Sequence, residues 1–297
     1  MNYRKLPHTA LEISEISFGC MSLDLAQKNN VQLLRDAHEL GINYFDTADL
    51  YDKGANEELV GEALKPIRQE VIIATKVGNE WLPDGGNWRW NPTKSYILRA
   101  VEKSLKRLQS DYIDLYQLHG GTIEDSREEV IEAFELLKEA GKIRHYGISS
   151  IRPNVIRPYT EESNIVSNMM QYSLLDRRPE ENVLGNLEGK VGVMVRGALA
   201  KGLLAGKPAK EYLDRDIGEV EQMQLALNKL VQPNRTSGQI ATLYVLDHPA
   251  VTTAVVGIRT MKQLLEAIGT QNADPLTTQE KNTLSAALKP NIYTAHR

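Results

Sequence analysis

The sequence predicts an α/β fold, in which eight parallel strands and their connecting helices close into a (β/α)8 TIM barrel. Short apolar, β-branched runs alternate along the chain with longer stretches of helical period, as expected when each strand is followed by a helix. Most of these runs are apolar nearly throughout, as in parallel strands buried on both faces. A doubly wound open sheet would show the same alternation, so the ends of the strands must distinguish the two folds.

Nearly every predicted strand ends at a polar or ionisable residue. These residues are Asp46, Lys76, His119, Ser149, Gln171, Arg196 and Arg259. In a barrel the carboxyl ends of all strands meet at one mouth, where catalytic residues collect. In an open sheet they would spread along an edge, with one crevice at the switch point. The repeated polar endings therefore favour the barrel.

The predicted strands follow one another at intervals that leave room for a helix each, and an N-terminal β-hairpin precedes them. They are Ile16–Phe18, Ile42–Phe45, Val71–Thr75, Tyr112–Leu118, Arg144–Ile148, Ile165–Met170, Val191–Val195 and Thr253–Val256. An apolar stripe at helical spacing after NPT (91–93) predicts one helix. The segment SREE (126–129) predicts a capping box at the start of another, which Gly141 ends.

Two longer stretches, 79–91 and 197–213, interrupt the alternation after the third and seventh strands. We expect them to be long irregular loops at the carboxyl-terminal face, where such loops are usually functional. The first contains all three tryptophans, Trp81, Trp88 and Trp90. Aromatic residues gathered in a polar, glycine-rich loop suggest a wall of the substrate pocket, to which we assign Trp81 and Trp88. Packing of the loop against the barrel is an equally good explanation.

Length and composition agree with one domain over residues 1–297. A (β/α)8 barrel needs roughly 250 residues, and the chain has 297, with a formal net charge of -4 that argues against a nucleic-acid partner. No apolar run is long enough to span a membrane, and the first residues lack the apolar core of a secretory signal. The single cysteine excludes an intrachain disulfide. We therefore expect a cytoplasmic protein.

The chemistry of the mouth rests on Asp46, Tyr51, Lys76 and His119, which lie on three successive strands or their loops. Taken singly, each has an ordinary structural explanation. A lysine in a barrel mouth needs an anionic partner, because an unpaired buried ammonium is costly, and Asp46 on the neighbouring strand can be that partner. A cation close to Tyr51 would lower the pKa of the phenol and fit it to act as a general acid. His119 could orient a carbonyl oxygen.

These groups protonate an oxygen and contain no redox centre. The six histidines are scattered, without an HxH or HExxH arrangement, so we expect no metal site. If the oxygen belongs to a carbonyl that is being reduced, a cofactor must supply the hydride. Lys76 as the nucleophile of a Schiff-base enzyme is an alternative, although pairing with Asp46 would keep the amine protonated.

The segments INYFDTADLYDKGANEELVGEAL, VIIATKVG, DYIDLYQLH and GKIRHYGISS resemble, in order and spacing, the signature segments of the aldo-keto reductase superfamily. The resemblance runs from about Tyr3 to about Gly269 and is strongest to bacterial reductases. It implies that Tyr51 is the proton donor, that Lys76 and Asp46 tune it, and that His119 orients a carbonyl substrate. The small-molecule pocket would also include Met21 and Tyr293.

The resemblance also implies a nicotinamide cofactor. The cofactor-binding residues that we predict are Gly19, Met21, Ser149, Ser150, Gln171, Arg196, Gly197, Leu199, Lys201, Gly202, Gly257, Ile258, Arg259 and Gln263. Ser149 and Gln171 would hold the nicotinamide carboxamide. Ser150 stands where family members commonly carry asparagine, and Gly197 lies where many carry an aromatic residue that stacks on the nicotinamide.

The expected phosphate site lies at the last strand. No GxGxxG follows the first strand, so a Rossmann turn is absent, and barrels often bind phosphate after strands seven and eight, near a helix N-terminus. Thr260 can cap that helix. Arg259 and Gln263 could hold a 2′-phosphate, which favours NADP(H) over NAD(H). A sensor that resembles the β subunits of potassium channels is the alternative from another functional class.

Overall fold

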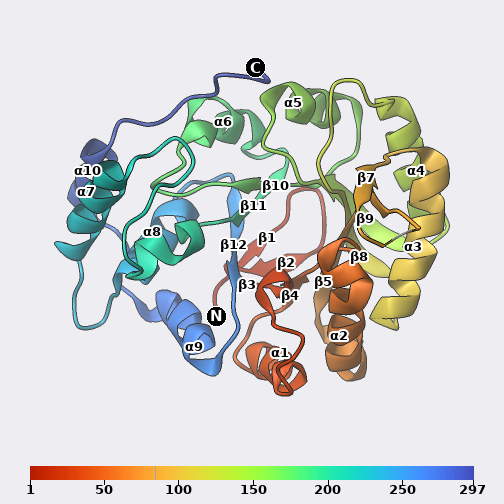
Figure 1. Cartoon of the computed structure of the whole chain (residues 1–297), viewed down its shortest axis with the longest axis horizontal. Helices are drawn as coiled ribbons and strands as arrows, with labels where there is room; N and C mark the ends of the chain where they lie inside the picture. Colours follow the sequence, from red (N-terminus) through yellow and green to blue (C-terminus); the bar gives the residue numbers. More distant parts are fainter. Residues whose placement is uncertain (84) are drawn as a thin grey trace.

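The computed structural model describes residues 1–83 and 85–297, and in it eight parallel strands close into a barrel. Figure 1 shows these strands at the centre of the molecule with the helices in a ring around them. The (β/α)8 prediction is confirmed, and each predicted strand overlaps an observed one. The barrel strands are β3 (Ile16–Gly19), β4 (Tyr44–Asp46), β5 (Ile72–Val77), β8 (Ile113–Leu118), β9 (Ile143–Ile148), β10 (Ser167–Gln171), β11 (Gly192–Arg196) and β12 (Val251–Gly257).

The helices together cover the outside of the barrel. They are α1 (Asn30–Glu39), α2 (Ala55–Leu64), α3 (Lys94–Leu108), α4 (Arg127–Glu139), α5 (Pro153–Glu162), α6 (Val183–Leu187), α7 (Ile217–Asn228), α8 (Ser237–Leu246), α9 (Met261–Gly269) and α10 (Thr278–Ala287). Helices α1 to α8 lie between successive barrel strands, and α9 and α10 follow the last strand. Among the described residues, none of these helices has the length and apolar character needed to cross a bilayer.

The N-terminal hairpin closes one end of the barrel. Its strands β1 (Tyr3–Lys5) and β2 (Glu12–Ser14) pair antiparallel, as predicted. Leu6 and Ile13 are fully buried and pack into the barrel interior with residues such as Tyr44 and Met194. Because the barrel strands are all parallel, the polar residues that end them collect at the opposite end.

The two-residue period of a strand explains why these polar residues face the barrel interior. Tyr44, Ala74, Leu115, Met169 and Met194 all belong to the interior cluster. Alternate side chains of a strand point to the same face. The residues two positions further along these strands are Asp46, Lys76, Gln117, Gln171 and Arg196. They therefore form the next layer of the interior, at the carboxyl-terminal mouth.

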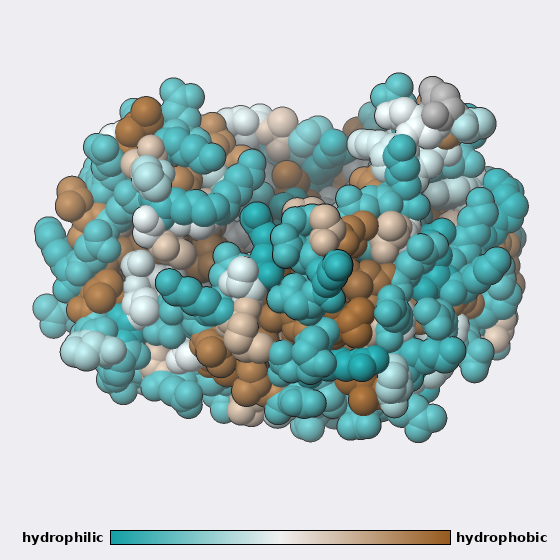
Figure 2. Space-filling view, turned by 60° about the horizontal axis from the view of Figure 1, so that its bottom comes forward, coloured by the Kyte–Doolittle hydropathy of each residue, from teal (hydrophilic) through white to brown (hydrophobic). Residues whose placement is uncertain are grey.

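The stretch 79–91, which we expected to be irregular, contains a two-stranded hairpin. Strands β6 (Asn79–Trp81) and β7 (Trp88–Trp90) pair antiparallel, with Trp81 opposite Trp88. Tryptophan favours strands, and glycines between the two short strands allow the chain to reverse. Figure 2 shows this hairpin raised at the upper right of a mostly hydrophilic face, with a hollow beside it.

The capping box predicted at 126–129 does not form, although α4 begins at the expected place. Ser126 is the N-cap of α4, but its side chain makes no capping hydrogen bond, and its ψ is 91°. The threonines that cap α8 and α10 do form capping boxes and have ψ values of 167° and 158°. The smaller ψ of Ser126 turns the chain so that its hydroxyl does not meet the free N–H groups of the first turn.

Candidate active site

The ammonium group of Lys76 is the centre of the polar layer at the mouth. Its Nζ donates hydrogen bonds to Asp46 Oδ1 at 2.6 Å, to the Thr47 carbonyl oxygen at 2.7 Å and to the Tyr51 hydroxyl at 3.3 Å. The side chains of Lys76 and Asp46 are only 1% and 6% exposed. Burial would lower the pKa of Lys76, but the Asp46 carboxylate and the Tyr51 hydroxyl outweigh it, and the pKa is raised. Lys76 is therefore a persistent ammonium.

Local chain geometry places Tyr51 over this ammonium. The loop after β4 is hydrogen-bonded to β5. The Thr47 N–H donates to the Ala74 carbonyl oxygen, and the Asp49 N–H donates to the Lys76 carbonyl oxygen. Tyr51 then begins a short 3₁₀ segment in which Asp52 and Lys53 adopt positive φ angles of 48° and 58°. Positive φ is uncommon for residues other than glycine, so the turn has a conformation that the surrounding contacts must maintain.

The net effect of the site on Tyr51 differs from our expectation. Burial raises the pKa of the Tyr51 phenol, and the nearby Lys76 charge, which lowers the pKa, only partly offsets this. The predicted lowering is therefore wrong for the site as a whole, because the cost of burying a phenolate exceeds the attraction of the cation. Tyr51 remains a phenol, which is the form that can donate a proton.

His119 follows β8 and lies beside Tyr51. Its ring packs edge-on against the Tyr51 ring, with the ring centroids 5.7 Å apart, and its backbone N–H donates to the Val77 carbonyl oxygen. Burial, with smaller contributions from the Lys76 and Arg196 charges, lowers the pKa of His119 to about 3. The imidazole is therefore neutral at physiological pH and can donate a hydrogen bond without carrying a charge.

The depressed pKa of His119 predicts a specific dependence of stability on pH. The unfolded chain binds a proton at His119 near pH 6.5, whereas the folded chain does so only near pH 3. The folded state therefore loses stability as the pH falls below 6.5. Between pH 7.5 and pH 5 the wild type should lose about 2 kcal/mol more than His119→Asn. Urea unfolding of both proteins at the two pH values measures this difference, and equal losses would contradict a neutral, buried His119.

Gln171 and Arg196 lie side by side on the paired strands β10 and β11. Arg196 donates to Gln171 Oε1 at 3.1 Å, and Gln171 Nε2 donates to Asp176 Oδ2 at 2.9 Å. Asp176 is in turn held by two hydrogen bonds from Arg178, each at 2.7 Å. The orientation of the Gln171 amide is therefore fixed from both ends.

The two serines after β9 have different surroundings. Ser149 is half-buried, and its N–H donates to the Leu118 carbonyl oxygen. Ser150 is buried, and its hydroxyl accepts from the Arg152 N–H at 3.2 Å. Ser150 also exchanges hydrogen bonds with Asn168 through its backbone. The Ser150 hydroxyl thus already has a partner within the chain, and Ser149 is the better placed of the two to contact a ligand.

The segment after β12 has the predicted form of a phosphate site. Thr260 caps α9, with its side chain accepting from the Gln263 N–H, while Gln263 Oε1 accepts from the Arg259 N–H at 2.9 Å. The Arg259 side chain is exposed. Ile258 is fully buried, so only its backbone can reach a ligand. A Cβ on Gly257 would lie 2.2 Å from Ser22 Oγ, so a larger residue there would displace the Ser22 side chain.

The predicted cofactor loop after β11 folds as a short 3₁₀ segment over residues Ala200–Ala205. Lys201 and Gly202 have positive φ angles of 58° and 93°. Lys207 Nζ donates to the Lys201 carbonyl oxygen at 2.9 Å and closes the turn. Four other predicted cofactor residues lie beside this segment or at the end of β3. Gly19 is buried, Gly197 and Leu199 are half-buried, and Met21 is exposed.

The three tryptophans separate into two roles. Trp88 is 50% exposed, and Lys53 Nζ lies 5.4 Å from the centre of the Trp81 ring. Trp90 instead donates to Asp125, and a Cβ on Gly78 would lie 2.6 Å from the Trp90 ring. Trp90 therefore fixes the hairpin against the end of β5, while Trp81 and Trp88 are available as a pocket wall.

Two groups that hold the predicted site residues in place were not predicted from the sequence. The Thr47 carbonyl oxygen completes the surroundings of Lys76, and Asp176 fixes Gln171. The charged run DRR at 176–178, five residues after Gln171, was the available signal for Asp176. A backbone carbonyl such as that of Thr47 leaves no signal in a sequence, because every residue has one.

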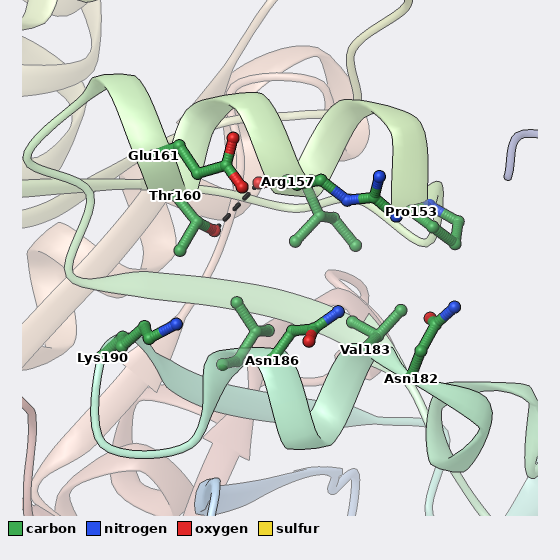
Figure 3. Close-up of a pocket in the computed structure, with 10 residues that line it drawn as sticks. Pro153, Arg157, Thr160, Glu161, Asn182, Val183, Asn186 and Lys190 are labelled. Atoms are coloured by element: carbon green, nitrogen blue, oxygen red, sulfur yellow. Dashed lines mark hydrogen bonds between the residues drawn. The ribbon is translucent and has the colours of Figure 1, made fainter.

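A second hollow lies outside the barrel, between α5 and α6 (Figure 3). Side chains of Arg157, Thr160, Glu161, Asn186 and Lys190 point toward it, and its volume is about 130 Å³. Pockets for small molecules usually have about 300 Å³ or more. None of the predicted site residues lines this hollow, so it is separate from the candidate active site at the barrel mouth.

Comparison with known proteins agrees with this geometry. The model of the aldo/keto reductase family matches residues 15–289. The uncharacterized oxidoreductase YqkF of Bacillus subtilis is 49% identical over an alignment that covers 100% of both chains. The aldo-keto reductase yakc [NADP(+)] of Schizosaccharomyces pombe is 30% identical, with 86% of this chain and 83% of that protein covered.

Among solved structures, the aldo-keto reductase AKR11C1 of Bacillus halodurans is similar over nearly its whole length. Its holo form has a TM-score of 0.93 and 46% identity, covering 100% of this chain and 99% of that chain. Its apo form, with the same coverage, has a TM-score of 0.85.

Proposed function

The chain belongs to the aldo/keto reductase family, and we propose that it reduces aldehydes or ketones to alcohols with NADPH, with Tyr51 as the proton donor. The observation that carries the proposal is the ammonium of Lys76, which is held by Asp46 and donates to the Tyr51 hydroxyl. The hydroxyl that would lose a proton is thus in direct contact with a fixed positive charge.

Each residue of the site would have a different role in proton donation. Tyr51 is protonated in the resting site, so it can pass its proton to a carbonyl oxygen as negative charge develops there. Lys76 then stabilises the remaining phenolate, and Asp46 keeps the ammonium in place. His119, which is neutral, orients the carbonyl oxygen. A bound nicotinamide cofactor supplies the hydride.

The mouth contains side chains that fit such a cofactor. Gln171 presents an amide held from both ends, and Ser149 is half-buried at the neighbouring strand end. We propose that these two contact the carboxamide. The turn at residues 197–206 would cover the pyrophosphate. The name of the S. pombe relative supports NADP as the cofactor, and the higher TM-score to the holo form of AKR11C1 supports an arrangement ready for a ligand.

We propose that Arg259 selects NADPH by its 2′-phosphate. Its exposed guanidinium follows β12 at the N-terminus of α9, where a helix favours anions. Arg259→Ala should weaken NADPH binding about 10- to 100-fold, since hydrogen bonds to charged groups contribute about 1.5–3 kcal/mol. NADH binding should change less than about twofold.

Calorimetric titration of both cofactors measures these affinities. Lys262→Ala is the matched control, because Lys262 is an exposed cation in the first turn of α9, three residues after Arg259. If Arg259→Ala weakened NADPH and NADH equally, Arg259 would not contact the 2′-phosphate.

A sensor that binds the cofactor without rapid turnover is the second candidate. The Tyr51–Lys76–Asp46 arrangement favours turnover, because a sensor has no need for a proton donor. A panel of aldehydes, ketones and quinones, followed by NADPH absorbance, separates the two. Tight NADPH binding with slow oxidation for every compound would favour the sensor. A Schiff-base reaction is disfavoured, because the raised pKa of Lys76 keeps its amine protonated.

A further inference from the structure

Arg196 carries a positive charge at the mouth that the surrounding residues do not neutralise. It ends β11, its side chain is exposed, and its guanidinium donates to the neutral amide of Gln171 at 3.1 Å. Within residues 1–83 and 85–297, no carboxylate lies within 4 Å of this guanidinium in an ion pair. An exposed arginine at a site normally has water or a ligand as its remaining partner.

Two carboxylates at the mouth are each paired with a cation other than Arg196. Asp46 is paired with Lys76 at 2.6 Å, and Asp176 is paired with Arg178 at 2.7 Å. His119, whose pKa burial chiefly lowers to about 3, is neutral. Among the described residues, the positive charge of Arg196 is therefore not compensated by an ion pair.

The order of the strands places Arg196 on the cofactor side of the barrel. β11 lies between β10 and β12, and three strands separate it from β5 in either direction around the closed barrel. The tryptophan hairpin follows β5, so the proposed substrate wall and Arg196 stand on opposite sides. Arg196 instead adjoins Gln171, the proposed contact of the nicotinamide carboxamide, and the turn at 197–206.

The two forms of the nicotinamide ring differ in charge. The oxidised ring is a pyridinium cation, whereas the reduced ring is neutral. A fixed positive charge nearby disfavours the oxidised ring and leaves the reduced ring almost unaffected. We propose that Arg196 makes the site bind NADPH in preference to NADP⁺, and so favours loading of the reduced cofactor and release of the oxidised one.

This inference rests on the proposed function, because it assumes that the mouth binds a nicotinamide cofactor. The charge of Arg196 also reaches the reacting groups: it is a minor contributor to the pKa values of Tyr51 and His119, behind burial and Lys76. Gln171, whose orientation Arg196 and Asp176 fix together, links Arg196 to the carboxamide. Arg196 thus acts as a specificity-determining residue for the redox state of the cofactor.

Calorimetric titration with NADPH and with NADP⁺ tests the proposal without any turnover. In Arg196→Gln the ratio of the NADP⁺ Kd to the NADPH Kd should fall about tenfold, as expected for the loss of one nearby charge. The glutamine amide can still donate to Gln171, so the hydrogen bond is kept while the charge is lost. Arg196→Lys, which keeps the charge, should leave the ratio within about threefold of the wild type.

Two further measurements sharpen the test. Arg259→Gln should weaken both redox forms by the same factor, because the 2′-phosphate is common to them. In the wild type the ratio should also fall as ionic strength rises, since the exposed charge of Arg196 is screened.

The possible outcomes separate this inference from the proposed function. If neither NADPH nor NADP⁺ bound to the wild type, the proposed function would fail. If both bound and Arg196→Gln left their ratio unchanged, the role assigned to Arg196 would be overturned. The role would also be overturned if Arg196→Gln left the ratio constant but raised the KM for an aldehyde that carries a carboxylate more than the KM for its methyl ester. Arg196 would then bind the substrate rather than select the redox state of the cofactor.

Discussion

Replacing Tyr51 with phenylalanine is expected to slow carbonyl reduction by about 10²–10⁴-fold, the usual contribution of a positioned general acid. The change removes one oxygen and leaves the ring in contact with His119. Lys76 keeps its hydrogen bonds to Asp46 and to the Thr47 carbonyl. NADPH binding should therefore stay within about twofold of the wild type, which single-turnover kinetics and calorimetric titration can measure separately.

The same chemical change at Tyr159 is a suitable control. Tyr159 is a buried residue of α5, and its hydroxyl has no hydrogen-bond partner among the described residues. Tyr159→Phe should leave the rate of reduction nearly unchanged. If Tyr51→Phe reduced carbonyls at the rate of the control, Tyr51 would not be the proton donor.

Replacing Lys76 with methionine is expected to damage both activity and stability. Methionine has a similar shape but no charge, so Asp46, with a side chain that is only 6% exposed, would be left as a buried carboxylate without its cation. Removing one partner of a buried ion pair lowers the free energy of unfolding by about 3–5 kcal/mol. Reduction should also slow by at least about 100-fold, because the phenolate of Tyr51 would lose its neighbouring positive charge.

The double variant Asp46→Asn with Lys76→Met separates the two effects. Removing both charges leaves no buried ion without a partner, so much of the lost stability should return. The rate of reduction should remain low, because no cation is restored next to Tyr51. Urea unfolding and steady-state kinetics on the same samples measure both quantities. Recovery of activity together with stability would show that Lys76 has only a structural role.

Much of the barrel and of its mouth could be predicted from the sequence, because both depend on short-range pattern. The apolar runs locate the strands, and the polar residue that ends each run lies where parallel strands converge. The pairing of Asp46 with Lys76 was predictable from the cost of a buried, unpaired ammonium. The 2.6 Å contact between them confirms that reasoning.

Other features depended on tertiary contacts that no local pattern shows. The pKa of Tyr51 reflects how deeply the phenol is buried, and the sequence indicated only the cation beside it. The hairpin at 79–91 forms where Trp90 packs over Gly78, a contact that the local sequence does not indicate. The Ser150 hydroxyl accepts a hydrogen bond from the Arg152 N–H, a contact within the chain that its alignment with a ligand-binding asparagine did not indicate.

Isotope tracing of the hydride tests the proposed reaction most directly. With NADPH deuterated at the transferable position of C4, the wild type should form an alcohol that carries one deuterium at the former carbonyl carbon, and Tyr51→Phe should form this product at least about 100-fold more slowly. Mass spectrometry of the product measures both quantities. An alcohol without deuterium, or one labelled equally fast by Tyr51→Phe, would contradict the assignment of this chain as a Tyr51-dependent carbonyl reductase.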